Sequence, residues 1–431
     1  MHIILEMPAL LRIVIVFVCI LIAIRRNLSL GNAFLLGAVT LGLLFGLGPI
    51  AMLKSVLHAV LDAKTISLAV IVSLILILSS SMEISGQMQR LLGGFGRLKS
   101  PRLNLIFFPA LIGLLPMPGG AVFSAPMVKE FGALSGLKPE EMSFINYWFR
   151  HIWEYWWPLY PGVLLAITLS DISLWIFMPV MFPLTVVVVI LGMSFLRGTG
   201  TDKRDESGDH ADATSLAPFL RELLPIALVI VLGLGSGVIL SKSVPAFTVA
   251  KESGLIFALS VAIVMVWRAN AMTHTQVKEA LFNPQLLNMI YMVFAILIFN
   301  GMLEESHAVG IINSELRILP VPLAFLVIVL PFLVGGLVAI TMAFVGSTFP
   351  ILIALVNAFG QSGHLLDYLM LAYVSGYAGV MLSPLHLCLI LSNEYFNADL
   401  PAVYQYILPR ALALLAFGII YFWILKDLIG I

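Results

Sequence analysis

The segment "LLPMPGGAVFSAPM" (residues 114–127) decides the fold of this chain, because it interrupts a long apolar stretch. It contains two adjacent glycines, Gly119 and Gly120, and the three prolines Pro116, Pro118 and Pro126. Proline removes a backbone donor and glycine permits tight turns, so one straight helix cannot run through this segment. The sequence therefore predicts a turn or an unwound stretch inside an otherwise apolar region.

The composition indicates an integral membrane protein. Of 431 residues, 61% are hydrophobic and 11% are charged, whereas soluble domains carry roughly 25% charged residues. The apolar runs are continuous rather than alternating, which favours membrane-spanning α-helices over a β-barrel. The 23 basic and 23 acidic residues balance, so nothing points to nucleic acid. The two cysteines, Cys19 and Cys388, lie in apolar runs and predict neither a disulfide nor a metal site.

The apolar runs fall into two sets separated by a polar segment. Spans are predicted near residues 8–24, 29–48, 65–84, 141–170 and 173–196, and near 222–241, 251–267, 285–303, 365–394 and 405–427. Between the sets, "RGTGTDKRDESGDHADATS" (197–215) has the composition of a solvated linker. We therefore divide the chain into a first transmembrane repeat (1–197), a polar cytoplasmic linker (198–218) and a second repeat (219–431).

The two halves repeat each other in detail. "LILSSSMEISG" (76–86) matches "LIFNGMLEESH" (297–307), "PALIG" (109–113) matches "PFLVG" (331–335), and "AVFSAP" (121–126) matches "VGSTFP" (345–350). Each half has about five full spans plus one broken segment, so the second half inserts upside down relative to the first, as in many secondary transporters. The predicted fold is an all-α polytopic membrane protein with two inverted-topology repeats, each with a re-entrant helical hairpin and an interrupted helix.

Basic residues support this count, because cytoplasmic loops carry an excess of Lys and Arg. If the Arg25–Arg26 loop is cytoplasmic, the loops on its side of the membrane hold most of the loop Lys and Arg residues. This bias predicts a multi-pass protein of the cell inner (plasma) membrane with both termini outside and the linker inside.

The predicted hairpins are residues 103–130 and 331–358, with "GSTFP" (346–350) at the second break. Irregular backbone at membrane depth survives only within protein or beside a water-filled cavity. Half-helix N-termini attract anions, and half-helix C-termini offer carbonyl oxygens to cations. The predicted substrate-binding residues at these tips are Gly119, Gly120, Ser124, Gly346, Ser347 and Thr348.

A second pair of breaks follows the hairpins, in "NYWFRHIWEYWWPLYPG" (146–162) and "LAYVSGYAGVMLSPLHLC" (371–388). The full set of predicted helix-breaking prolines is Pro116, Pro118, Pro126, Pro158, Pro350 and Pro384. Charge deep in a membrane costs about 2.5–3.5 kcal/mol, so it usually faces a cavity. Arg150 is predicted to assist anion binding, with an interfacial anchor as the alternative, and it can pair with Glu154 one helical turn away. The predicted ion-coupling residues are Glu154, His151, Ser383 and His386.

Inverted halves with a broken hairpin and then an interrupted helix resemble the ion-transporter superfamily, which includes divalent anion:sodium symporters, citrate carriers and gluconate permeases. "PMPGGAVFSAPM" (116–127) and "GSTFP" look most like an uncharacterised prokaryotic family of that superfamily, known as a domain of unknown function. The resemblance covers essentially the whole chain. It implies a scaffold domain, a moving transport domain and often a homodimer. It also places Ser124, Ser347 and Thr348 at tips that hold substrate and coupling ion. The Ser-Asn-Thr signatures of the dicarboxylate carriers are not intact, because neither tip contains asparagine.

The sequence therefore predicts a secondary active transporter of a small organic anion, a carboxylate, coupled to Na⁺ or H⁺ and working by an elevator-type motion. No cofactor is expected, and no Walker-type loop predicts ATP drive. One rival is a cation/proton antiporter that uses Glu154, Glu83 or Glu304. The others are an intramembrane enzyme acting on lipid, which no Ser/His/Asp set supports, and a purely structural scaffold.

Overall fold

The computed structural model describes residues 7–94, 101–117, 119–198, 216–243, 249–308, 310–311, 315 and 322–429. These residues form helices and no β-strand. Pro118 and most of the polar linker, residues 199–215, lie outside the described residues.

Each predicted span corresponds to one or two helices. In chain order the helices are α2 (Ala9–Arg25), α3 (Leu30–Leu44), α4 (Pro49–Leu61), α5 (Ala63–Ile84), α6 (Gln87–Gly94), α7 (Pro101–Ile112), α8 (Ala121–Leu134), α9 (Pro139–Arg150), α10 (Pro161–Ser170), α11 (Leu174–Gly198), α12 (Leu216–Ser243), α13 (Ala250–Ala269), α14 (His274–Leu281), α15 (Pro284–Glu305), α17 (Leu323–Val338), α18 (Thr341–Ala358), the short η1 (Ser362–His364), α19 (Leu365–Leu382), α20 (Leu387–Phe396) and α21 (Leu400–Ile429). The structure adds helices that were not predicted, among them α4, α6 and α14.

Among the described residues, eight helical segments are long and apolar enough to cross a membrane. The chain is thus a multi-pass, all-helical membrane protein. Several other helices are too short to cross alone: α7 has 12 residues and extends about 18 Å, against a hydrocarbon core of about 30 Å.

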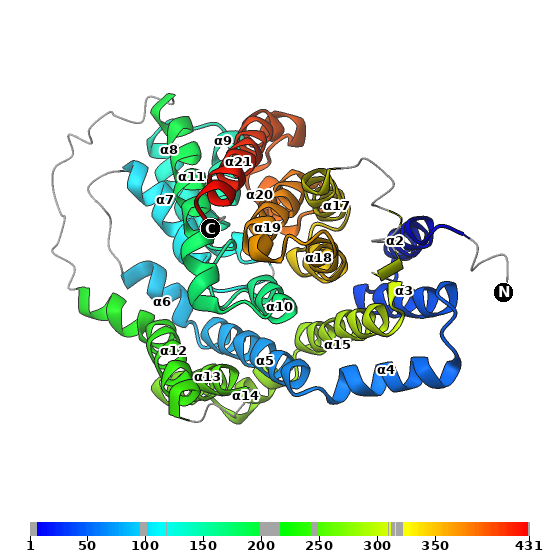
Figure 1. Ribbon diagram of the computed structural model, residues 1–431. Helices are drawn as coiled ribbons and strands as arrows, with labels where there is room; N and C mark the ends of the chain where they lie inside the picture. Colours follow the sequence, from blue (N-terminus) through cyan, green and yellow to red (C-terminus); the bar gives the residue numbers. More distant parts are fainter. Residues whose placement is uncertain are drawn as a thin grey trace.

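The helices form two layers (Figure 1). We call α2–α6 and α12–α15 the scaffold layer, and α7–α11 with α17–α21 the hairpin layer, because it holds both predicted hairpins. Each half of the chain contributes to both layers. Contact between them is sparse and includes α5 with α10 and α15 with α18.

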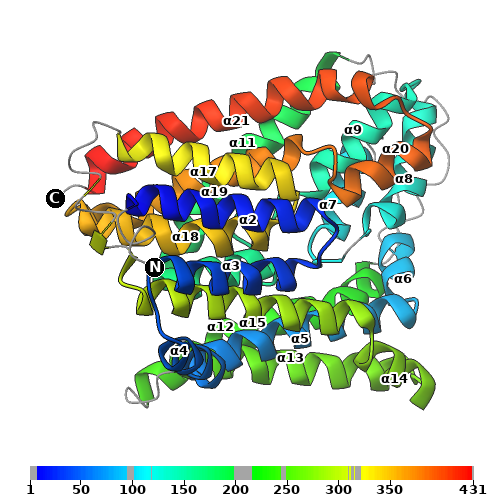
Figure 2. The ribbon, with the colours of Figure 1, turned by 90° about the vertical axis from the view of Figure 1, so that its right-hand side faces the viewer.

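The two halves run in opposite directions through the bundle. The end of α5, at Ser79 and Glu83, lies beside the start of α15, at Asn283 and Gln285. The end of α15 in turn lies near Thr65 at the start of α5. These two helices occupy matching positions in the repeats, so the repeats are inverted. Accordingly, α2 begins and α21 ends at the same end of the bundle (Figure 2).

One backbone contact occurs in both halves and confirms their correspondence. A Cβ atom at Gly113 would collide with the backbone carbonyl of Arg150, and one at Gly335 would collide with the carbonyl of Gly376. Gly113 and Gly335 are the last residues of the matching segments "PALIG" and "PFLVG". In each half, therefore, a glycine in or directly after the hairpin's first helix lets the interrupted helix approach at backbone distance.

The first hairpin turns where the sequence predicts it. Helix α7 ends at Ile112, residues 113–117 and 119–120 lie between the two helices, and α8 begins at Ala121. Gly119 has φ +74°, a left-handed conformation that favours glycine.

The second hairpin turns earlier than predicted. It bends at Ala339, which has φ 60°, and Ile340, and α18 then runs unbroken from Thr341 through "GSTFP" to Ala358. The prediction of a break at Gly346–Pro350 is therefore wrong. Pro350 and Pro126 both lie inside continuous helices. A proline in an apolar run marks a break only where the neighbouring packing does not hold the helix together.

Both interrupted helices are confirmed. Between α9 and α10 lies an irregular stretch, residues 151–160, that contains Pro158. Between α19 and α20 lies a shorter one, residues 383–386, that contains Pro384.

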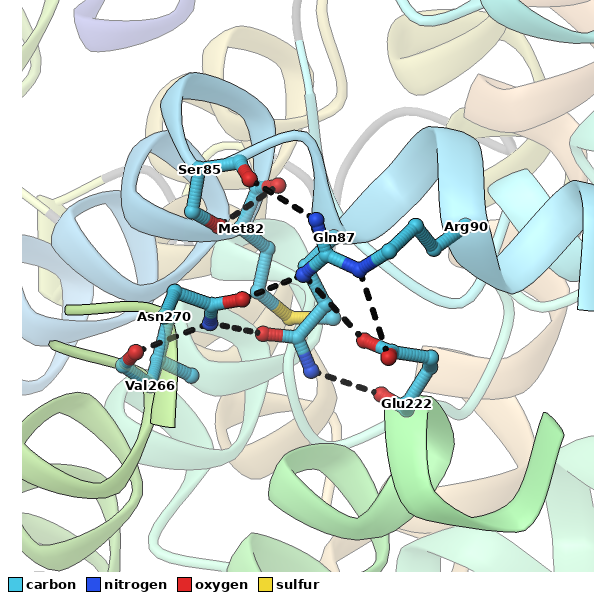
Figure 3. Close-up of polar contacts among 7 residues, drawn as sticks. All are labelled: Met82, Ser85, Gln87, Arg90, Glu222, Val266 and Asn270. Atoms are coloured by element: carbon cyan, nitrogen blue, oxygen red, sulfur yellow. Dashed lines mark hydrogen bonds and ion pairs between the residues drawn. The ribbon is translucent and has the colours of Figure 1, made fainter. Parts of the chain in front are cut away.

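A polar cluster joins the two halves of the scaffold layer where the linker enters the second half (Figure 3). Arg90 on α6 forms an ion pair with Glu222 on α12, with Nε 3.3 Å from Oε1. Its guanidinium also donates to Asn270 at the end of α13. Asn270 Nδ2 donates to Gln87 Oε1 at 2.8 Å, and Gln87 Nε2 donates to the Glu222 carbonyl at 2.9 Å.

Within this cluster we expect Asn270→Ala to lower the free energy of unfolding by about 1–3 kcal/mol, because it leaves the buried Gln87 carbonyl without a donor. Glu222→Gln is the matched control. It weakens only an ion pair whose Arg90 side chain is 46% exposed, so its effect should stay below about 1 kcal/mol. Thermal unfolding of the purified chain in detergent measures both, and equal effects would show that the ion pair dominates.

Candidate anion site at the helix breaks

The breaks of the two interrupted helices lie against each other in the hairpin layer, where α9 packs on α20. The imidazole Nε2 atoms of His151, in the first break, and His386, in the second, are 3.1 Å apart. Both residues are buried. The sequence analysis named them separately as ion-coupling candidates, and the structure brings them into contact.

Arg150 is the last residue of α9 and is 3% exposed. Its Nη2 donates to the Met117 carbonyl in the first hairpin turn at 2.6 Å, and its Nε donates to the Cys388 Sγ at 3.5 Å. Its Nη1 is buried and has no hydrogen-bond partner among the residues that the structure describes. The guanidinium is therefore part of the interior where hairpin and breaks meet, and the interfacial-anchor alternative is wrong.

Glycine at position 120 makes room for this guanidinium. A Cβ atom there would lie 2.6 Å from both Nη atoms of Arg150. Gly120 is the N-cap residue of α8 and has no side chain that could cap the helix. The positive end of a helix dipole and an arginine together favour a negative charge. An anionic group at Nη1 would satisfy that donor with a charge-assisted bond.

Glu154 faces His151 rather than Arg150. Its Oε1 is 3.7 Å from His151 Nε2, and Thr341, the first residue of α18, donates to its Oε2 at 3.5 Å. The chain leaves helical geometry after Arg150, so the i,i+4 spacing that predicted an Arg150–Glu154 pair does not apply. Through Thr341 the second hairpin reaches the first break.

Aromatic side chains hold the first hairpin in place. Trp153 Nε1 donates to the Ala110 carbonyl at 2.7 Å, Trp157 Nε1 to the Leu114 carbonyl at 2.9 Å, and Tyr160 OH to the Gly113 carbonyl at 2.6 Å. The last carbonyls of a helix have no intrahelical partner, and in a membrane they must be satisfied by protein. These aromatics thus stabilise the end of α7.

Ser124 belongs to a closed polar network. Its hydroxyl donates to Asn146 Oδ1 at 2.6 Å. Asn146 Nδ2 donates to the Ala121 carbonyl at 3.0 Å and to Ser392 Oγ on α20 at 2.9 Å. Asn146 lies on α9, 22 positions after Ser124, and no local motif indicates this contact.

Gly346, Ser347 and Thr348 do not lie at a hairpin tip, because all three are inside α18. Ser347 and Thr348 are buried and donate to carbonyls of their own helix, Ala343 and Phe344, both at 2.7 Å. A Cβ atom at Gly346 would meet Ile296 on α15 at 2.5 Å. These residues pack inside α18 and toward the scaffold layer, which follows from the earlier position of the turn.

The remaining predicted residues are Ser383, Glu304 and Glu83. Ser383 ends α19, is buried, and accepts a hydrogen bond from the Leu385 amide at 3.3 Å. Glu304 lines a cavity of about 650 Å³ at one end of the molecule, between the scaffold layer and the end of α10. Glu83, its counterpart in the repeat, lines a cavity of about 20 Å³ that also touches Pro116 and Met117.

The sequence analysis missed Cys388, which it interpreted as an apolar core residue. Cys388 lies in the second break region and contacts Arg150. His151, His386 and Cys388 each have a donor atom within 4.8 Å of the others, and all three are buried. The "HLC" spacing at 386–388 was the only signal in the sequence, since His151 comes from the other half.

Comparisons with known proteins agree with this architecture. The fold is similar to that in "Crystal structure of the Alcanivorax borkumensis YdaH transporter reveals an unusual topology", with a TM-score of 0.62, 15% sequence identity and coverage of 88% of each chain. A sequence comparison with curated proteins found no match. The family model described as "Protein of unknown function (DUF401)" matches residues 7–426. Two inverted halves, two hairpins and two facing breaks are therefore the architecture of a chain that belongs to the DUF401 family.

Proposed function

We propose that this chain is a secondary active transporter that moves a small organic anion, a carboxylate, across the membrane. The proposal rests on the environment of the Arg150 side chain. Its guanidinium is buried between the first hairpin turn and the second break, and Nη1 has no partner among the described residues. An uncompensated buried donor on a permanent cation is costly, and the carboxylate of a substrate would compensate it.

The cavities support alternating access. Matching positions of the two repeats, Glu304 and Glu83, line cavities of about 650 Å³ and about 20 Å³. In an inverted repeat, exchange of these two environments opens the site to the opposite side. Because the layers make few contacts, movement of the hairpin layer against the scaffold layer, an elevator-type motion, is the exchange we propose. The fold likeness to a transporter supports this motion. We also propose that the family is part of the ion-transporter superfamily.

A gradient of Na⁺ or H⁺ would drive accumulation. The test is uptake by liposomes that contain the purified full-length chain, across a panel of mono-, di- and tricarboxylates. Each acid is tested with an imposed Na⁺ gradient, an imposed pH gradient and neither. Binding is followed in parallel as a rise in melting temperature, because a ligand of the folded state stabilises it. We expect one carboxylate both to stabilise the chain and to accumulate under one of the two gradients.

Thr348→Ala is the control for a hydroxyl that does not take part in the proposed site, because this hydroxyl donates to the Phe344 carbonyl within α18. It should keep the stabilisation by the carboxylate. If no organic anion binds or accumulates, while a pH-sensitive dye inside the liposomes reports cation/proton exchange, the antiporter replaces the carboxylate transporter.

A further inference from the structure

We propose that His151, His386 and Cys388 form a binding site for one divalent transition-metal ion of the zinc class, with Glu154 as the fourth ligand. This inference goes beyond the proposed transport function and does not rest on it. Two imidazoles, a thiol and a carboxylate are the donor types that Zn²⁺ takes in proteins.

The donor atoms are already gathered. One atom from each of the three side chains lies within 4.8 Å of the others. The two Nε2 atoms are 3.1 Å apart, and the Glu154 Oε1 is 3.7 Å from His151 Nε2. With bonds of about 2.0–2.3 Å, a tetrahedral Zn²⁺ holds its ligand atoms roughly 3.3–3.8 Å apart. Closing the widest separation, 4.8 Å, to this range takes a movement of about 1 Å. Glu154, which now lies next to His151, would turn toward the ion to complete the shell.

His151 is oriented as a metal ligand usually is. Its Nδ1 lies 2.6 Å from the Tyr147 carbonyl oxygen, and that oxygen can only accept, so Nδ1 carries the proton. The lone pair of the neutral ring is then on Nε2, which points to His386 and Glu154. Such a bond from the second ring nitrogen to a carbonyl is the common way in which proteins fix a metal-binding histidine.

The second imidazole also presents its Nε2 atom to the cluster. His386 Nε2 faces His151 Nε2, while its Nδ1 has no hydrogen-bond partner among the described residues, so no bond of the kind that Tyr147 makes fixes this ring. Cys388 and His386 lie two residues apart around the start of α20. The second break region therefore supplies two ligand atoms, and the first break supplies His151 and Glu154.

The two anionic ligands match the charge of the ion. A Cys388 thiolate and the Glu154 carboxylate neutralise a divalent ion, and Arg150 lies beside the cluster with its Nε 3.5 Å from Cys388 Sγ. The guanidinium keeps its single positive charge. A bound ion would join the breaks of the two halves. It would add to the contact between His151 and His386, which are 235 positions apart in the chain.

The experiment uses the untagged full-length chain in detergent. Zn²⁺ bound after dialysis is counted by metal analysis, and its affinity is measured by competition with a chelator. Co²⁺ serves as the spectroscopic substitute. We expect about one tight Zn²⁺ per chain, and a near-ultraviolet thiolate-to-Co²⁺ band. Cys388→Ser should lose that band and weaken Zn²⁺ binding by at least about tenfold, since even outer-shell changes at metal sites cost this much.

Cys19→Ser is the matched control, because Cys19 is the other cysteine of the chain, and it should bind both ions as the wild type does. Melting without metal checks that each variant folds, and Cys388→Ala replaces Cys388→Ser if the latter does not. His274→Gln, outside the cluster, measures binding by peripheral histidines. The proposal is overturned if the wild type shows no saturable Zn²⁺ binding at micromolar free ion, or if loss of the Cys388 thiol leaves binding unchanged.

Discussion

Replacing Arg150 with glutamine is expected to lower the affinity for the transported carboxylate by about 10- to 150-fold. A hydrogen bond to a charged group contributes about 1.5–3 kcal/mol, and each 1.4 kcal/mol is tenfold in affinity. The change also removes the positive charge beside the N-terminus of α8, where Gly120 leaves room for it. Carboxylate-induced stabilisation and liposome uptake measure the loss.

Arg150→Lys separates charge from geometry. Lysine keeps the charge but lacks the planar fork, so we expect an affinity between those of the wild type and Arg150→Gln. Arg410→Gln controls for the loss of a half-buried guanidinium elsewhere: Arg410 stacks on Phe144 and Phe195 and donates to the carbonyls of Leu191 and Tyr406. It should leave carboxylate affinity unchanged. Full affinity in Arg150→Gln would contradict the anion site.

The largest loss of stability is expected from Gly335→Ala, at about 3 kcal/mol or more. A Cβ atom at this position would overlap the Gly376 carbonyl oxygen. Both atoms belong to backbone in packed helices, α17 and α19, so neither can move aside as a flexible side chain would. Equilibrium unfolding in mixed micelles measures the change.

Gly336→Ala is a control on the same helix, one residue away. Its nearest neighbour, the Gly379 carbonyl oxygen, would lie 3.7 Å from the new methyl group, an ordinary contact. Because alanine is the better helix former by up to about 1 kcal/mol, Gly336→Ala should be neutral or slightly stabilising. Equal destabilisation by both substitutions would mean that helix α17 does not approach α19 at Gly335.

The sequence by itself determined the helices and most of the breaks. Apolar run length and the positions of proline and glycine are local properties, so the interruptions at Pro116, Pro158 and Pro384 were predicted correctly. The internal repeat was also readable, because Gly113 and Gly335 stand in matching segments and make the same contact in each half.

Only the tertiary structure decided which side chains meet. Whether a proline breaks a helix depends on its neighbours, so Pro126 and Pro350 lie in continuous helices and the second hairpin turns at Ala339. The pairing of His151 with His386 depends on how two halves of the chain pack, and no spacing within either half encodes it. The breaks follow from local backbone chemistry, whereas the candidate site follows from long-range packing.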